Sequence, residues 1–355
     1  MKAWIFNRNE LTLALQDAAQ PELRAGAALV RMEAVPLLSY TRNYLQGKLP
    51  YAYPPSPFTP GTNGIGRIVA VGAGVQSLRP GQRVALNPYW IADEAVAEAP
   101  QVLIGLTGIS ADSAPMLAEY PHGSWREIAD FPASTLLPLD GLDHVAPERL
   151  ALLAKFIVPF GGLRRGRLSA GETVAINGAG GYFGSAAVLA ALAMGAGQVI
   201  ALGRNAQALQ QLVDLGKGRV LAVTLTGDVA GDAAAIRAAA GGSVALGLDM
   251  VGQATDAGST LALLHSLGRG GRLVLMGSMQ VDLPLPYGAM LLNNWELIGN
   301  FMYSAADYRA LLALLRAGLL PLDAVELTTF AFSALETAID HAAQMKGLQA
   351  TVALF

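Results

Sequence analysis

Hydrophobic positions in the first part of the chain come in short runs that alternate with polar residues and stop at glycine or proline. Runs of this kind are typical of β-strands. They predict a mainly β domain over residues 1–150, interrupted by a weakly patterned segment at 88–123 that is long enough for a lid, a lobe or a subunit contact. The predicted strands are residues 2–6, 11–15, 28–35, 64–72 and 83–86.

After residue 146 the hydrophobic period becomes helical, first over residues 153–158. Short apolar segments then alternate with helical ones, which predicts an α/β domain with a doubly wound parallel sheet over residues 151–300. Amphipathic helices at 308–317 and 333–345 and a closing strand at 350–355 follow. The predicted strands of this domain are residues 173–177, 199–202, 220–223, 244–249, 272–277 and 295–299.

A glycine-rich turn joins the first of these strands to an alanine-rich helix. Such a turn directs the free N–H groups of the helix toward an anion, and the glycines allow the backbone to approach a dinucleotide diphosphate closely. An ordinary strand-to-helix turn is the alternative, but a second β-branched strand follows as a dinucleotide site requires. The predicted contacts are Gly178, Gly180, Gly181, Tyr182, Phe183 and Gly184.

The second strand ends in Gly203, Arg204 and Asn205, where NAD-specific sites usually carry an acidic residue. A guanidinium can hold the 2′-phosphate that distinguishes NADP(H), whereas a carboxylate would repel it. We therefore expect NADP(H), with Asn205 capping the next helix. The alternative for Arg204 is a solvated side chain at the start of that helix.

The composition narrows the function further. With 53% hydrophobic and 14% charged residues, the 355-residue chain can bury two large cores, and its net charge of −3 without a basic cluster gives no electrostatic reason to bind nucleic acid. No segment resembles a membrane span or a signal peptide, so we expect a cytoplasmic protein. The absence of cysteine excludes disulfides, thiolate nucleophiles and cysteine zinc ligands.

Taken together, several segments resemble the medium-chain dehydrogenase/reductase superfamily over nearly the whole chain. They are residues 57–61, 64–72, 78–84, 168–174, 249–252 and 268–274. The resemblance implies that a GroES-like domain over 1–150 is completed by 301–355, with the active site in the cleft between the two domains. It also implies nicotinamide contacts at Gly277, Ser278, Met279, Phe301 and Met302, and a homodimer joined along the strand at 295–299.

The chain departs from the zinc enzymes of that superfamily. Leu38, Thr62, Asn63 and Ala154 stand where those enzymes carry catalytic zinc ligands, so we expect no metal. The four-cysteine zinc lobe is also missing, and residues 88–123 have the place of its metal-free remnant. The glycine turn is similar to the zinc-independent quinone oxidoreductase branch, although the Asn and Asp common in that branch at positions 38 and 41 are absent here.

Without a metal, a hydroxyl or amine must stabilise the charge that develops on a substrate oxygen. By resemblance, Tyr40 occupies the place of a proton relay, Tyr51 and Tyr53 lie near the catalytic tyrosine of related enoyl reductases, and Lys155 follows a lost ligand position. Each has a structural alternative, a packed tyrosine or a lysine that reaches solvent. Thr62, Asn63, Tyr89 and Trp90 are candidates for the substrate pocket, while the four dispersed histidines match no ligand spacing and are interpreted as structural.

The sequence thus predicts an NADP(H)-dependent oxidoreductase that reduces a small molecule by hydride transfer. The expected substrate is an enone, an enal or a quinone, because the electrophilic carbon of each accepts hydride without help from a metal. A metal-free alcohol, carbonyl or imine reductase of the same fold is the alternative. A non-catalytic NADPH-binding protein is the second.

Overall fold

The computed structural model spans the whole chain and describes residues 1–93 and 95–355. The chain forms two compact units, each built from segments that are distant in sequence. The first unit comprises Met1–Ala154, Glu326–Met345 and Ala350–Phe355, and the second comprises Lys155–Val325 and Lys346–Gln349. Within the described part of the chain, none of the helices combines the length and hydropathy that crossing a lipid bilayer requires.

The first unit is built on a seven-stranded sheet in which β10, β5, β4, β3, β18 and β17 follow one another and β9 pairs with β3. Leu29, Val30 and Val35 of the long strand β3 are buried, so this strand forms part of the core. The strands of the sheet are β3 (Ala27–Leu37), β4 (Gly64–Val71), β5 (Arg83–Leu86), β9 (Ile128–Pro132), β10 (Leu136–Pro138), β17 (Glu326–Ala331) and β18 (Gln349–Leu354). Outside the lobe described below, the helices of the first unit are α1 (Thr41–Leu45), α3 (Pro147–Leu150) and α11 (Leu335–Ala342), with single 3-10 turns at Ala133–Thr135 and Phe332–Ala334.

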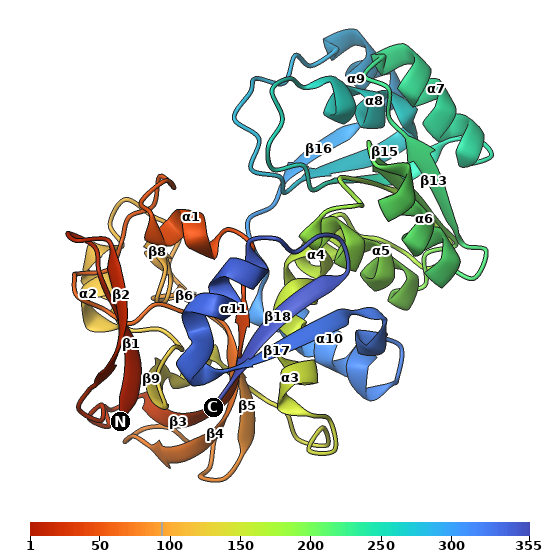
Figure 1. Cartoon of the computed structure of the whole chain (residues 1–355). Helices are drawn as coiled ribbons and strands as arrows, with labels where there is room; N and C mark the ends of the chain where they lie inside the picture. The colour runs from red at the N-terminus through yellow and green to blue at the C-terminus, as the bar shows by residue number, and fades with distance from the viewer. Residues whose placement is uncertain (94) are drawn as a thin grey trace. The chain divides into compact units, whose positions relative to one another are not determined.

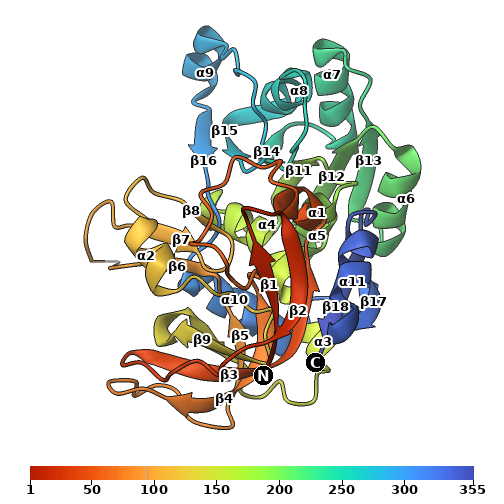
Figure 2. The same ribbon diagram turned by 60° about the vertical axis from the view of Figure 1, so that its left-hand side comes forward.

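Two smaller sheets complete the first unit. Strands β1 (Lys2–Asn7) and β2 (Thr12–Asp17) form an antiparallel ribbon. The weakly patterned segment at 88–123 forms a lobe, in which β6 (Tyr89–Ile91), β7 (Gln101–Leu103) and β8 (Thr107–Gly108) pair beside α2 (Ala114–Glu119). Figure 2 shows this lobe gathered to one side of the larger sheet. A lobe was one of the three expected possibilities for this segment, but its strands are too short to give a recognisable hydrophobic period, so the sequence did not predict them.

The second unit contains a six-stranded parallel sheet in the order β13-β12-β11-β14-β15-β16. Chain order reverses between β11 and β14, as in doubly wound dinucleotide-binding folds. Helices lie on both faces, with α7 and α8 on one side and α4 and α5 on the other (Figure 1). The strands are β11 (Thr173–Asn177), β12 (Gln198–Gly203), β13 (Val220–Thr224), β14 (Val244–Asp249), β15 (Leu267–Leu275) and β16 (Glu296–Gly299). The helices are α4 (Leu153–Arg165), α5 (Tyr182–Ala193), α6 (Ala206–Leu215), α7 (Val229–Ala239), α8 (Gly258–Ser266), α9 (Tyr287–Asn293) and α10 (Ala305–Arg316), with a 3-10 turn at Leu322–Ala324.

The predicted fold class, an α/β chain with a doubly wound parallel sheet and a β-rich domain, is confirmed. The boundary near the C-terminus differs from the expectation, because residues 301–325 belong to the second unit and only later segments complete the first. Contacts of α10 explain the difference. Asp307 accepts a hydrogen bond from Arg164 of α4 at 2.6 Å, and Gly161 of α4 leaves no room for a Cβ beside Tyr303.

Candidate cofactor and substrate sites

The glycine turn between β11 and α5 has the geometry that a bound diphosphate requires. Gly178 has a φ of +76°, which glycine adopts without strain. A Cβ on Gly184 would lie 2.0 Å from the Gly178 carbonyl oxygen, so only glycine lets α5 begin this close to the strand. Helix α5 starts at its N-cap Gly181 without a side-chain cap, which leaves its first-turn N–H groups available to an anion.

The end of β12 presents an unused guanidinium. Asn205 caps α6 by accepting a hydrogen bond from the Ala208 N–H at 3.1 Å, which confirms the predicted cap. Arg204, directly after the last strand residue Gly203, is exposed, and its side chain forms no hydrogen bond or ion pair with any residue that the structure describes. The capped helix fixes the backbone while the arginine side chain is left for a ligand.

The residues predicted to contact nicotinamide follow the carboxyl ends of β15 and β16. The Gly277 N–H donates to the Asp249 carbonyl at 3.0 Å, and a Cβ on Gly277 would lie 2.0 Å from the Val251 carbonyl oxygen. Ser278 and then Met279 continue this segment, and the Ser278 hydroxyl donates to the Gly252 carbonyl at 3.2 Å. The backbones after β14 and β15 are thereby held in contact.

After β16, Met302 adopts a φ of +55° and its carbonyl accepts a hydrogen bond from the Asn300 side chain at 2.9 Å, while Phe301 is 54% exposed. All the predicted cofactor residues therefore lie at the carboxyl edge of one parallel sheet. Ligands of doubly wound sheets bind at this edge. The residues present fit a dinucleotide.

A buried polar network beneath the turn was not predicted as part of the site. Asp249, at the end of β14, accepts hydrogen bonds from the Thr260 hydroxyl, from the Val251 N–H at 3.0 Å and from the Asn177 amide at 3.3 Å. Burial raises the pKa of the Asp249 carboxyl, although these three donors oppose the rise. The network ties β11 to β14 at the point where strand order reverses. The only feature of the sequence that could have indicated this network is Asp249 itself, a single acidic residue at the end of an apolar strand.

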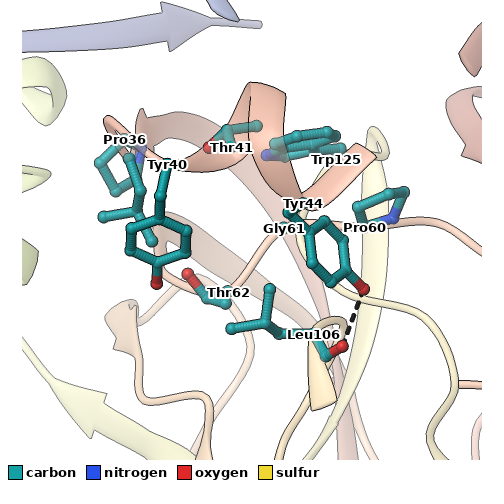
Figure 3. Close-up of a pocket in the computed structure, with 10 residues that line it drawn as sticks. Pro36, Tyr40, Thr41, Tyr44, Pro60, Gly61, Thr62, Leu106 and Trp125 are labelled. Atoms are coloured by element: carbon teal, nitrogen blue, oxygen red, sulfur yellow. Dashed lines mark hydrogen bonds between the residues drawn. The ribbon is translucent and has the colours of Figure 1, made fainter. Parts of the chain in front are cut away.

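The first unit contains a small cavity of about 20 Å³ that opens to the surface (Figure 3). Tyr40 and Thr62, both predicted from the sequence, lie on its wall, and Figure 3 shows their side chains beside each other. The Thr62 hydroxyl donates to the Asn63 side-chain oxygen at 3.1 Å, and the Asn63 amide lies 3.4 Å from the Leu86 carbonyl. The lining residues are Pro36, Leu38, Tyr40, Thr41, Tyr44, Pro60, Gly61, Thr62, Leu106 and Trp125.

This wall does not fit a catalytic zinc. Zinc sites use cysteine, histidine or acidic side chains, and the lining contains none of them. Elsewhere among the described residues, no group of three or more such side chains could hold a metal ion. Leu38 and Thr62, which stand at two of the family's ligand positions, contribute an apolar surface and a hydroxyl instead.

Tyr44 is a wall residue that the sequence did not single out. It is 2% exposed, and its hydroxyl donates to the Leu106 carbonyl at 2.7 Å, as Figure 3 shows. Burial raises the pKa of Tyr44 well above its usual value. Because Tyr40 and Tyr44 are four residues apart at the start of α1, the helical period brings both to the same side. That spacing was a usable signal.

Tyr51 and Tyr53 belong to an aromatic cluster and do not line the cavity. The Tyr53 hydroxyl donates to the Tyr44 carbonyl at 2.6 Å, and its ring stacks on that of Tyr44 at 4.6 Å. Arg8 lies over the Tyr53 ring, 4.4 Å from its centroid, while the Tyr51 ring lies 5.9 Å from that of Tyr44. Both tyrosines pack against Tyr44 of α1, and their catalytic role stays a prediction.

Three further candidates are not among the residues that line the cavity. In the lobe, the Tyr89 hydroxyl donates to the Gln101 side chain at 2.6 Å, and Trp90 packs edge-on against Tyr120 at 5.0 Å. Lys155 belongs to the second unit, where it is fully buried beside the glycine turn and donates to the Tyr182 carbonyl at 2.6 Å. The structural alternative, a lysine whose amine reaches solvent, is therefore wrong for Lys155. Its position was invisible in sequence because its partners are far along the chain.

Two family models match this chain, one in its N-terminal part and one in its C-terminal part. Residues 24–141 match the alcohol dehydrogenase GroES-like domain, and residues 183–317 match the zinc-binding dehydrogenase domain. An alcohol dehydrogenase from Geobacillus stearothermophilus is 28% identical over 309 residues, 86% of each chain. The likeness to the quinone oxidoreductase branch stays a prediction.

Solved structures share the whole fold. An alcohol dehydrogenase from Thermus sp. ATN1 aligns over 100% of this chain and 99% of its own, with a TM-score of 0.79 and 23% identity. An alcohol dehydrogenase from E. coli CFT073, solved with NADH, aligns over 100% and 99%, with a TM-score of 0.79 and 20% identity. With both family domains present in order and the cofactor edge in place, the chain belongs to the medium-chain dehydrogenase/reductase superfamily and is an oxidoreductase with a nicotinamide-cofactor-binding fold.

Proposed function

We propose that the protein is an NADP(H)-dependent oxidoreductase that reduces an activated C=C bond, in an enone or enal, or a quinone, without catalytic zinc. The observation that carries this proposal is the composition of the cavity wall. It offers the hydroxyl of Tyr40, beside a Thr62 hydroxyl that donates to Asn63, but no side chain that binds zinc. Chemistry at such a wall depends on hydrogen-bond donors.

The choice of substrate follows from the charge that has to be stabilised. In a zinc enzyme the metal stabilises the oxygen of a simple ketone by several kcal/mol, and this contribution is missing here. An enone or quinone is already electrophilic at the carbon that accepts hydride, and one positioned donor to the resulting enolate contributes about 2.7–4 kcal/mol. The nicotinamide supplies the hydride when bound. Tyr40 would donate a hydrogen bond to the substrate oxygen and then its proton, because a phenol is protonated at neutral pH.

Carbonyl or imine reduction with tyrosine in place of zinc is the second candidate. It is supported by the comparisons, since the matched proteins are named alcohol dehydrogenases. The same wall and the same cofactor edge would serve it. The two candidate reactions differ in how electrophilic the substrate carbon is before hydride is transferred.

The substrate experiment compares matched pairs. NADPH oxidation is followed with 2-cyclohexenone and cyclohexanone, and with a benzoquinone, before and after dialysis against a zinc chelator, with metal content measured in parallel. We expect turnover of the enone or quinone, little with the saturated ketone, and no loss on chelation. Preference for the saturated ketone would support the second candidate. Stoichiometric zinc whose removal abolishes activity would overturn both.

The cofactor preference rests on Arg204. Gly178, Gly181 and Gly184 would hold the diphosphate, and the unpaired guanidinium would hold the 2′-phosphate. A hydrogen bond to a charged group contributes about 1.5–3 kcal/mol. The variant R204A should therefore raise the Kd for NADPH by about tenfold or more and leave that for NADH unchanged.

Arg165 provides the matched control, because it is also exposed and forms no hydrogen bond or ion pair with a described residue, yet it precedes the amino end of β11. R165A should change neither Kd. Tighter binding of NADH than of NADPH by the wild-type protein would overturn the preference for NADP(H).

We also propose a homodimer formed through β16. This strand ends the six-stranded sheet, and an unpaired edge favours pairing with a second copy. The neighbouring helix α9 exposes Tyr287, Leu291 and Leu292 by 81%, 65% and 74%. The mass in solution should equal two chains and fall toward one in L292K, whereas L319K, at a leucine 54% exposed elsewhere, should stay dimeric. A monomeric wild-type protein would contradict the proposal.

A further inference from the structure

Lys155 is a fully buried amine beside the first turn of the dinucleotide helix. Its Nζ atom donates to the Tyr182 carbonyl at 2.6 Å and to the Gly347 carbonyl at 2.7 Å, with the Gln349 carbonyl farther away at 3.4 Å. The same atom lies 3.6 Å from the centroid of the Tyr182 ring. Since Tyr182 is the first residue of α5, the amine is one hydrogen bond away from the anion-binding end of that helix.

No negative charge balances Lys155 among the residues that the structure describes. From α5 it faces Tyr182, and from the segment Lys346–Gln349 it faces two backbone carbonyls, while Lys346 itself is exposed. None of the ion pairs in the described chain includes it. Burial lowers the pKa of Lys155 well below its usual value, with desolvation as the cause.

The surroundings of Nζ can accept a further proton without rearrangement, because three carbonyl oxygens and the Tyr182 ring surround it. A neutral amine has two N–H groups, and two carbonyls lie at short distances from Nζ. The third proton of an ammonium ion would be directed at the Gln349 carbonyl, at 3.4 Å. A buried ammonium without an anion is costly, which favours the neutral form until an anion arrives.

We infer that Lys155 is a positioning residue whose amine takes up a proton when the diphosphate of a dinucleotide binds at the start of α5. The bound anion supplies the missing counter-charge, and the ammonium ion in turn adds to the positive potential of the helix end. By bonding Gly347 and Tyr182 together, the same side chain holds the segment Lys346–Gln349 against that end. The inference rests on the proposed dinucleotide site.

The first experiment measures how many protons the protein takes up when NADPH binds. Calorimetric titration of the protein with NADPH, in buffers of different ionisation enthalpy between pH 6.5 and 9, gives the proton uptake on binding. We expect the wild-type protein to take up a substantial fraction of a proton per NADPH, and its affinity to weaken by roughly tenfold across this range as protonation becomes harder. K155M should show neither effect, whereas K217M, at an exposed lysine of the same unit, should behave as the wild type does.

A second measurement needs no variant at Lys155. The chain has five lysines, so labelling their side-chain carbons allows each to be titrated by NMR. One lysine should titrate at a depressed pKa in the free protein and at a higher one with NADPH bound. Binding without proton uptake, or uptake unchanged in K155M, would overturn the role of Lys155 alone. Failure of the wild-type protein to bind any dinucleotide would overturn the site and the inference together.

Discussion

Replacing Gly184 with alanine tests the glycine turn most directly. The new Cβ would lie 2.0 Å from the Gly178 carbonyl oxygen and 2.9 Å from the Ala179 Cα, both backbone atoms that cannot rotate away. Ordinary contact begins near 3.4 Å, so α5 or the turn must shift by about 1.4 Å, the difference between 3.4 and 2.0 Å. Overpacking of this kind costs about 1–3 kcal/mol. A displaced helix end also loses its alignment with the diphosphate.

Gly288 offers the matched control, because it is also helical but has nothing within 4 Å of an added Cβ. G288A should stabilise the protein by about 0.4–1 kcal/mol, since alanine loses less backbone entropy on folding. G184A should lower the calorimetric Tm by about 2–12 °C, at roughly 2–4 °C per kcal/mol.

Binding provides the second measurement. G184A should weaken NADPH binding by up to about 100-fold in a fluorescence titration, while G288A leaves it unchanged. If G184A kept both the Tm and the affinity of the wild type, the close approach of α5 to its strand would not position the cofactor and the reasoning would be refuted.

Two further predictions concern the first unit. Burial, with a smaller contribution from Arg126, lowers the pKa of His122 to about 4, and its Nδ1 accepts a hydrogen bond from the Thr59 N–H at 3.1 Å. Because the unfolded chain binds this proton more readily, stability should fall by about 2–3 kcal/mol as the pH drops from about 6.5 to 4. Denaturant titrations should show a smaller loss in H122Q, and an equal loss would assign the effect to other groups. Y40F should reduce kcat about 10²–10³-fold in the NADPH assay, whereas Y53F should chiefly reduce stability; unchanged turnover in Y40F would exclude Tyr40 as the donor.

Local sequence patterns were sufficient for elements whose ends are marked by neighbouring residues. The strands at Thr173–Asn177, Val244–Asp249 and Arg83–Leu86 have the predicted bounds, because the turn residues on either side of an apolar run mark where the extended segment begins and ends. The cap at Asn205 needs only an N–H three residues ahead. Gly178 and Gly184 could be assigned to a tight turn for the same reason.

Long-range packing decided the rest. Tyr40 and Tyr53 look alike in sequence, yet one lines the cavity and the other donates to the Tyr44 carbonyl behind it. Lys155 appeared to be a surface or active-site lysine until the fold brought it carbonyls from 27 and 192 residues away. The sequence by itself determined most of the strands, turns and helices, because the hydrophobic period and the turn residues that bound each segment are local. Only the tertiary structure decided which side chains face a ligand, because that depends on distant segments that happen to cover or expose them.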